Sequence, residues 1–307
     1  MGHSKAKCNF ITANYIEEMT TPSNILSINI EVPKSSKYYR NLFKIVTLKT
    51  DIIPSDLKKK FKAFVTVKYM FGNCRYQAVI RQNGDRKDHV KFVENGPIQS
   101  LDVKLKDGNI INATRFKLLI PETRYGKNEI LATLILRKLG FVAPETFEVN
   151  AVINNVKAVM LFQERAEKEL LERNFRREGP IFEGDESLLW SYKNYGSFEL
   201  EPLSLSRLTN DNWFKKSDKS KQIVLKSYQQ LQSAYLNYAI SNLNNSNRLV
   251  VFPNFLKNKT FINYHSVLIA MNGTHALRPH NRKYYYNAIE EYFEPIYYDG
   301  NILFSPP

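Results

Sequence analysis

The sequence predicts an α+β protein of two lobes, with a strand-rich N-terminal half and a helical C-terminal half. Short segments of β-branched and aromatic residues, many of them alternating with polar ones, recur up to residue 162. After residue 163 the apolar positions recur at helical spacing instead. A single apolar helix interrupts the strands, so we expect the first lobe to hold one helix.

The first lobe is expected to be an antiparallel sheet. Turn clusters at 82–85 and 107–109 separate its segments. The predicted strands are Ile25 to Val32, Phe61 to Phe71, Tyr76 to Ile80 and Leu101 to Leu105. We assign residues 1–23 to an N-terminal extension and 24–162 to this lobe.

The predicted helix begins near Asn128, a suitable N-cap, and ends at Gly140. Residues 147–162 return to strand character and are interrupted at Asn154-Asn155, which predicts a hairpin. The second lobe, 163–307, is expected to be helical. Its predicted helices are a charged one at 163–176, one at 223–243 after a basic loop at 215–221, and a buried one at 261–271.

Composition restricts the class of protein without identifying it. The chain has 307 residues and a formal net charge of +14, which favours anionic partners. Cys8 and Cys74 lie far apart without a metal-binding spacing, so we expect two structural thiols and neither a zinc site nor a disulfide framework. There is no signal-peptide pattern or apolar run of membrane-spanning length, which predicts a soluble protein, cytoplasmic by default.

The residues that carry chemistry lie near the C-terminus. Segment 274–281 follows an apolar helix, and Asp299 comes eighteen residues after Asn281. This arrangement resembles the two metal-holding loops of kinases, in which an Asn and an Asp joined by a hairpin hold Mg²⁺ or Mn²⁺ against nucleotide phosphates. The hairpin strands would be Tyr284 to Tyr286 and Glu294 to Tyr298. The plainer alternative is a β-hairpin with an Asn cap and an Asp-Gly turn.

One position departs from the kinase catalytic loop. Against the pattern H-R-D-L-x-x-x-N, residue 277 and Asn281 match, but the catalytic-base Asp falls on Ala276. His275, His280 or Arg278 would then take the catalytic role, or the domain binds nucleotide without transferring phosphate. A zinc site built on the two histidines lacks a third ligand.

A wider resemblance covers residues 65–301. The ordered stretches are 80–85, 100–106, 115–118, 128–140, 143–144 and 159–171, and together they are similar to the spore-coat CotH kinase family. The resemblance implies an atypical kinase fold, ATP, a divalent metal, and phosphorylation of Ser or Thr in a protein partner that is acidic or Ser/Thr-rich. It also implies C-terminal helices beyond residue 301, which suggests that the chain is a fragment.

The same resemblance gives roles to residues of the first lobe. A kinase-like site needs a strand Lys on the phosphates and a helix Glu that orients it. Lys104 and Lys117 both suit the first role, Glu129 suits the second, and Glu164 suits an adenine-side contact. Arg81 and Gly84 belong to the loop expected near phosphate. The plainer alternatives are a solvated strand face for each Lys, the helix dipole for Glu129, and for Glu164 the start of the charged helix.

Two other functions remain open from the sequence. The first is a catalytically silent nucleotide-binding or coat-assembly module on the same fold, with Ala276 as the residue that divides it from a kinase. The second is a nucleic-acid-binding protein, which rests on charge and aromatics alone and has no recognition motif. Oligomeric state is not predicted.

Overall fold

The computed structural model describes residues 7–10, 15–184, 206–243 and 259–304. The chain divides into two units, and each is described by itself. The first unit consists of residues 1–130 and 144–165, and the second of 131–143 and 166–307.

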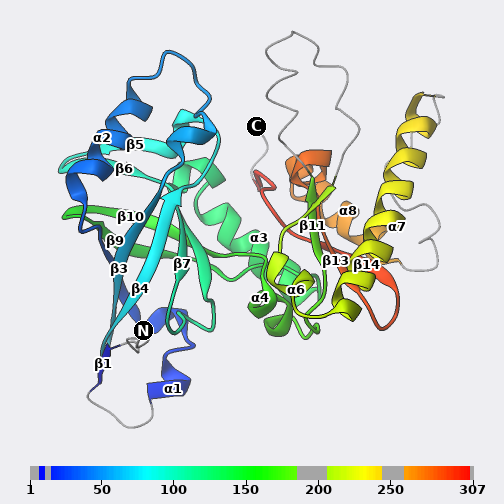
Figure 1. Ribbon diagram of the computed structural model, residues 1–307, viewed down its shortest axis with the longest axis horizontal. Helices are drawn as coiled ribbons and strands as arrows, with labels where there is room; N and C mark the ends of the chain where they lie inside the picture. The colour runs from blue at the N-terminus through cyan, green and yellow to red at the C-terminus, as the bar shows by residue number, and fades with distance from the viewer. Residues whose placement is uncertain (1–6, 11–14, 185–205, 244–258, 305–307) are drawn as a thin grey trace. The chain divides into compact units, whose positions relative to one another are not determined.

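Seven strands of the first unit close into a barrel (Figure 1). The order is β4-β3-β2-β9-β10-β8-β7, and β7 pairs back onto β4 to complete the ring. All neighbours are antiparallel except β2 and β9, which pair in parallel with Ile28 opposite Ala151. The seven strands are β2 (Ile25–Glu31), β3 (Lys60–Tyr69), β4 (Gly72–Gln82), β7 (Leu101–Leu105), β8 (Arg115–Leu119), β9 (Thr146–Ile153) and β10 (Val156–Glu164).

Alternation along these strands fills the barrel. Ile80, Val103, Phe116 and Phe162 are fully buried members of one hydrophobic core, while their sequence neighbours point to the opposite face. The remaining elements of the unit are α1 (Tyr15–Glu18), α2 (Ser35–Val46), the β5–β6 hairpin (Val90–Val93 and Gly96–Gln99), the first turn of α3 (Lys127–Lys138), and the 3₁₀ turns at Pro22–Asn24, Ser55–Leu57, Lys87–His89 and Pro121–Arg124.

A short N-terminal strand lies outside the ring. Strand β1 (Lys7–Phe10) pairs with the start of β4, and Cys8 stands opposite Cys74. These two cysteines form a disulfide. The prediction of two separate thiols is therefore wrong, because only strand pairing brings together positions 66 residues apart.

The second unit has its own sheet. Four antiparallel strands lie in the order β12-β11-β13-β14. The strands are β11 (Ile181–Gly184), β12 (Ser206–Leu208), β13 (Lys283–Asn287) and β14 (Tyr292–Ile296). The helices are the rest of α3, α4 (Lys168–Arg173), α6 (Asp211–Phe214), α7 (Asp218–Leu243) and α8 (Thr260–Ala270), with 3₁₀ turns η6 (Thr274–Leu277) and η7 (Pro279–Asn281).

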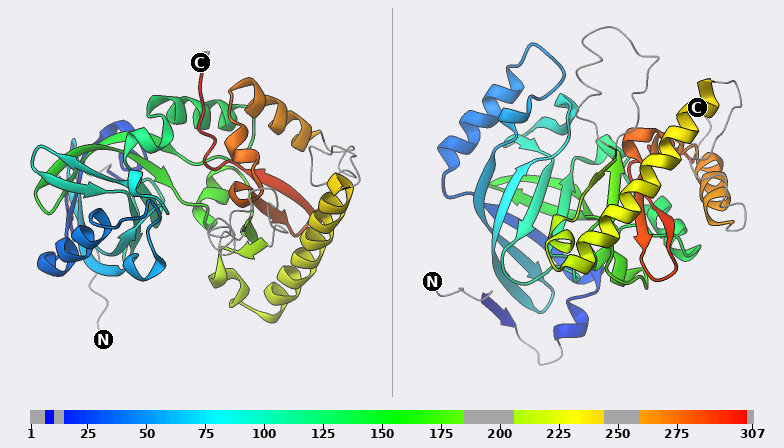
Figure 2. Two further views of the ribbon diagram at one scale, coloured as in Figure 1. Left: turned by 90° about the horizontal axis from the view of Figure 1, so that it is seen from above. Right: turned by 45° about the vertical axis from the view of Figure 1, so that its right-hand side comes forward.

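Helix α7 covers one face of this sheet, as Figure 2 shows in yellow beside the red hairpin. Leu231 and Tyr235 of α7 share a buried cluster with Tyr284, Tyr286 and Phe293 of the hairpin. The tyrosines that the sequence repeats at 284–286 thus serve mainly to pack the sheet, with Tyr285 in a second cluster on the other side.

The predicted kinase-like fold is wrong in both halves. The first unit contains a closed barrel, and the second is not a helical lobe because a four-stranded sheet forms part of its core. The resemblance rested on short ordered stretches. Such stretches determine local structure, but they do not determine which strands pair.

Many of the individual elements are confirmed. The strands at 25–32, 61–71, 76–80 and 101–105 are present, as is the helix at 128–139. The hairpin turn at Asn154-Asn155 has left-handed backbone at both residues, as a two-residue turn requires. Helices at 223–243 and 261–271 are present within one to five residues of their predicted starts. The charged segment at 163–176 is instead the end of β10, a link and the short helix α4.

Candidate functional site

In the second unit the chain brings His275, Asn281 and Asp299 together. Helix α8 ends at Ala270, and the chain turns at Gly273 into η6, which carries His275. A Cβ on Gly273 would lie 2.4 Å from the Ile302 side chain, and one on Gly300 would lie 2.8 Å from the Tyr297 hydroxyl. These two glycines therefore allow the loop before η6 and the loop after β14 to pack closely.

His275 is held by the backbone and side chain of Asp299. Its Nδ1 lies 2.8 Å from the Asp299 carbonyl oxygen and 3.6 Å from the carboxylate Oδ1. A carbonyl oxygen only accepts hydrogen bonds, so the contact with Asp299 requires a proton on Nδ1, which leaves the lone pair of the neutral ring on Nε2. The Asn281 amide Nδ2, 3.1 Å from the same Nδ1, then contacts the ring without donating to it. The nearby Asp299 side chain is the main reason why the pKa of His275 is raised, and its effect outweighs the opposing effect of burial.

Asn281 fixes the turn that presents the histidine. Its Nδ2 donates to the backbone carbonyl of His275 at 3.0 Å, and the residue is only 4% exposed. The predicted pair of Asn281 and Asp299 thus meets around the His275 side chain and backbone. In this arrangement His275 can accept a proton at Nε2 while Asp299 stabilises the imidazolium that forms.

The other predicted catalytic residues lie around this group. The His280 ring stands edge-on to His275 with the ring centroids 6.2 Å apart. Arg278 is exposed, and its backbone carbonyl accepts hydrogen bonds from the amides of Asn281 and Arg282. Ala276 is 4% exposed and belongs to the buried cluster that contains Leu268 and Tyr297. The position at which the kinase pattern has its catalytic-base Asp is therefore part of the hydrophobic core in this protein.

The donor set fits magnesium only in part. Within residues 7–10, 15–184, 206–243 and 259–304, no three His, Cys, Asp or Glu side chains lie close enough to hold a metal ion. Asn281 and Asp299 offer one amide and one carboxylate. Mg²⁺ is commonly bound by one or two carboxylates together with substrate phosphates and water, so the pair suits a metal that arrives with a nucleotide.

In the first unit a row of polar side chains crosses four strands on the outer face of the barrel. Arg81 of β4 stands opposite Asp102 of β7, which stands opposite Lys117 of β8 and then Gln163 of β10. Residues opposite each other in a sheet point to the same face, so these four side chains are neighbours. Their sequence neighbours fill the barrel interior.

Three arginines converge on Asp102. Its Oδ2 accepts from Arg115 Nη2 at 2.7 Å, from Arg165 Nη1 at 2.7 Å and from Arg81 Nε at 3.3 Å. Arg115 Nε also donates to Oδ1 at 2.9 Å. The carboxylate is 2% exposed, whereas the three guanidinium side chains are 20–40% exposed. We call these four residues the Asp102 cluster.

The Asp102 carboxylate has three guanidinium partners in a partly exposed patch. Burial alone would raise the pKa of Asp102, but the hydrogen bond from Arg115 and the charges of Arg165, Arg115 and Arg81 outweigh it and hold that pKa at about 2. The carboxylate is therefore ionised at neutral pH and keeps the arginines in place.

Further predicted residues adjoin this cluster. Lys117 is 8% exposed and Glu129 is fully buried. The Gln163 side chain, opposite Lys117 in the sheet, donates to Glu129 Oε1 at 2.8 Å. Glu164 accepts a hydrogen bond from the Glu145 amide at 3.3 Å. Gln163 is thus a neighbour of both Lys117, which it faces across the sheet, and Glu129, to which it donates a hydrogen bond.

The last two predicted residues differ in setting. Lys104 is exposed on the same face as Asp102, opposite Arg115. Gly84 has left-handed backbone, with φ of 88°, and a Cβ there would lie 1.9 Å from the His89 ring. Gly84 therefore has no room for a side chain because the His89 imidazole lies directly against it.

Sequence reasoning missed Asp102, Arg115 and Arg165 as members of the site. Asp102 and Arg115 lie on the polar side of alternating strands, as Arg81 does, so the alternation itself was the available signal. Arg165 follows the end of β10, and no local pattern indicates where its side chain lies.

Comparison with protein-family models and with curated proteins finds no match to this chain. Among the helices that the structure describes, none has the length and apolar character needed to cross a bilayer.

Proposed function

We propose that the protein binds the phosphates of a nucleotide at the Asp102 cluster, with ATP and Mg²⁺ or Mn²⁺ as its ligands. The observation that carries this proposal is the convergence of three partly exposed guanidinium groups on one buried carboxylate. Arginine presents planar paired donors that match phosphate oxygens, and bonds to charged acceptors are the stronger hydrogen bonds.

The cluster is organised before any ligand arrives. Asp102 remains ionised far below neutral pH, so it already holds the three guanidinium groups together when a ligand arrives. Arg81 is the most exposed of the three and makes only the longest contact, at 3.3 Å. We therefore expect it to contribute most directly to ligand and least to the fold.

Calorimetric titration with ATP, with and without Mg²⁺, tests this proposal. We expect Arg81→Gln to weaken ATP binding by about tenfold, the loss of one charge-assisted contact. Arg75→Gln is the matched control, because Arg75 also lies on β4 and also pairs with a carboxylate, that of Glu31. Failure to bind ATP at millimolar concentration, or equal weakening by both variants, would reject the proposal.

A second candidate function is phosphoryl transfer to a Ser or Thr hydroxyl of a protein. It is supported by the orientation of His275 and by the resemblance of 274–281 and Asp299 to the two metal-holding loops of kinases. In this reaction His275 Nε2 takes the hydroxyl proton as the oxygen attacks the γ-phosphorus. The bond to the bridging oxygen of ADP breaks, and a phosphate ester and ADP result. This candidate uses the second unit by itself: Asp299 and Asn281 would hold a divalent metal there, and the metal would neutralise charge on the phosphates.

Transfer is tested with γ-labelled ATP and an acidic, Ser-containing protein such as casein. We expect His275→Gln to reduce labelling by about a hundredfold, the usual contribution of a general base. His265→Gln is the control, since His265 lies on α8 in the same unit. ATP binding without labelling in the unaltered protein would favour the silent nucleotide-binding or coat-assembly alternative. Equal labelling by the His275 variant would exclude its role as base.

A further inference from the structure

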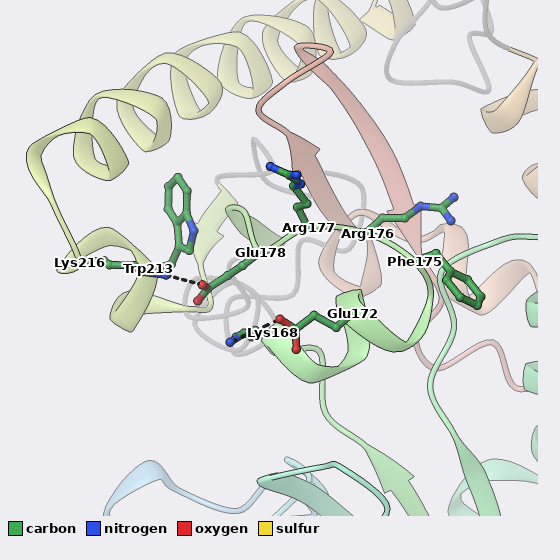
Figure 3. A pocket seen from close by; sticks show the side chains of 8 residues that line it. All are labelled: Lys168, Glu172, Phe175, Arg176, Arg177, Glu178, Trp213 and Lys216. Atoms are coloured by element: carbon green, nitrogen blue, oxygen red, sulfur yellow. Dashed lines mark hydrogen bonds and ion pairs between the residues drawn. The ribbon is translucent and has the colours of Figure 1, made fainter. Parts of the chain in front are cut away.

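The second unit has an open pocket of about 550 Å³ beside α4 and α6. Figure 3 shows Trp213 and Lys216 on one side of it and Phe175 on the other, with the side chains of Lys168 and Glu172 between them. None of the residues considered for nucleotide binding or transfer lines this pocket, so the function proposed above leaves it unassigned.

Most charges around the pocket are already paired. Lys168 pairs with Glu172 at 3.4 Å, and Lys216 pairs with Glu178 at 2.8 Å. Arg176 donates to Glu294, with Nη2 2.6 Å from Oε2.

Arg177 differs from these three cations. It is exposed, and its side chain makes no hydrogen bond or ion pair with any other residue in the described part of the chain. The pocket therefore presents one unneutralised positive charge, on a protein whose net charge is +14.

Phe175 is the second unusual residue. Its side chain is 95% exposed, although burial of a phenylalanine is favourable. Its backbone is left-handed, with φ of 59°. The conformation belongs to the Schellman turn that ends α4, in which the Phe175 amide donates to the Glu172 carbonyl and the Arg176 amide to the Leu171 carbonyl. Glycine is the usual residue at this position, so a phenylalanine there is strained.

The two sequence neighbours of Phe175, Asn174 and Arg176, explain why its side chain is held in solvent. Asn174 is 8% exposed, and its Nδ2 donates to the carbonyl oxygens of Leu170 and Ala143. Arg176 is fixed by Glu294 and by the Asn174 carbonyl. Because Asn174 and Arg176 are both held, the intervening Phe175 and the following Arg177 are presented to solvent on a fixed backbone.

We propose that Phe175, Arg177 and the Trp213 side of this pocket form a docking surface for an acidic segment of a partner protein. Aromatic residues and arginine are the side chains enriched at the centres of protein interfaces. The occupant is a peptide segment in which a carboxylate lies beside an apolar side chain. The carboxylate pairs with Arg177, and the apolar side chain packs on the Phe175 ring.

A random dodecapeptide display library, selected on the immobilised full chain, tests this surface directly. Before the selection, the library is passed over the immobilised double variant Phe175→Gly, Arg177→Gln, which removes peptides that bind elsewhere on the protein. We expect the enriched peptides to combine Asp or Glu with an apolar residue. The Kd of a synthetic enriched peptide is then measured by fluorescence anisotropy.

Each single variant should raise the Kd of that peptide by about tenfold or more, as loss of an interface hot spot does. Phe175→Gly also removes the backbone strain, so its melting temperature should not fall, and weaker binding cannot be attributed to misfolding. Phe43→Ala is the control, because Phe43 is 67% exposed on α2 and should leave binding unchanged.

Three results would overturn the proposal. One is that no peptide is enriched above the double variant. Another is that binding to vesicles of anionic phosphatidylserine depends on Arg177 while peptide binding does not. The third is self-association in sedimentation that Phe175→Gly abolishes, which would make a second copy of this chain the occupant.

Discussion

The imidazole Nδ1 of His275 lies 3.6 Å from the carboxylate Oδ1 of Asp299 and 2.8 Å from the carbonyl oxygen of the same residue. The two residues are 24 positions apart, on opposite sides of the β13–β14 hairpin. One residue thus acts on the histidine twice, through its backbone as a hydrogen-bond acceptor and through its side chain as a charge. The two effects can be separated by substitution.

We expect Asp299→Asn to lower the pKa of His275 toward its ordinary value of 6.5, because the variant keeps the carbonyl but loses the charge. Folding raises this pKa, so its contribution to stability is complete below pH 6.5 and is lost as the pH rises through the folded value. The free energy of unfolding should therefore differ less between a pH below 6.5 and a pH above it in the variant than in the unaltered protein. NMR titration of the imidazole measures the pKa, and an unchanged value would contradict the assignment.

The Asp102 cluster should be sensitive to neutralisation of its carboxylate. We expect Asp102→Asn to lower the free energy of unfolding by about 3 kcal/mol, since three guanidinium groups then surround a neutral amide. The pKa of Asp102 is lowered to about 2, so this stability is present above the unfolded pKa near 3.8 and is lost as pH falls toward 2. Urea denaturation measures it. Glu31→Gln, which breaks the exposed pair with Arg75, should cost less than about 1 kcal/mol.

The disulfide is expected to hold β1 on the barrel. Reduction should lower the free energy of unfolding by about 2–4 kcal/mol, since Cys8 and Cys74 close a long loop in the unfolded chain. Because β1 lies outside the closed ring, hydrogen exchange should accelerate at Lys7–Phe10 while β3 keeps its protection. Mass spectrometry of exchanged peptides distinguishes the two regions. Exchange that accelerates equally in β3 would show that the ring itself depends on the disulfide. Cys8→Ser should reproduce the reduced protein.

Arg176 is expected to stabilise the second unit. Its partner Glu294 is only 5% exposed, so Arg176→Met should leave a buried carboxylate without its main partner and cost about 3 kcal/mol. Arg207→Met is the control, since Arg207 pairs with Glu183 while remaining 53% exposed. Thermal unfolding measures both variants. A similar fall in melting temperature for the two would argue against a special role of the buried pair.

The sequence predicted elements better than it predicted their assembly. Strands such as 61–71 and 101–105 were found because alternating residues and turn clusters are local signals. The barrel was not, because its closure depends on the pairing of β7 with β4 and of β2 with β9, and each strand has the same alternating pattern whatever its partner. Helix α2 was also missed, although its buried residues Tyr38, Leu42 and Ile45 recur at helical spacing.

The candidate residues were predicted to the extent that local spacing defined them. The order of His275, Asn281 and Asp299 around a hairpin was readable, and the structure places both Asn281 and Asp299 within hydrogen-bond distance of His275. The convergence of Arg115 and Arg165 on Asp102 was not readable, because it joins three separate strands or strand ends. An exposed strand arginine and one that organises a cluster look identical in sequence.

The parallel pairing of β2 with β9 has a consequence for how the chain folds during synthesis. Residues 28 and 151, which pair, are separated by about 120 positions, and at roughly 5–20 residues per second the ribosome needs roughly 6–25 s to make that interval. During this time β2 is already able to pair with β3 on one side, while its other side has no partner from its own chain. An unpaired strand edge can pair with another chain. The nascent first unit therefore exposes a strand edge at which it can aggregate until residue 153 has emerged.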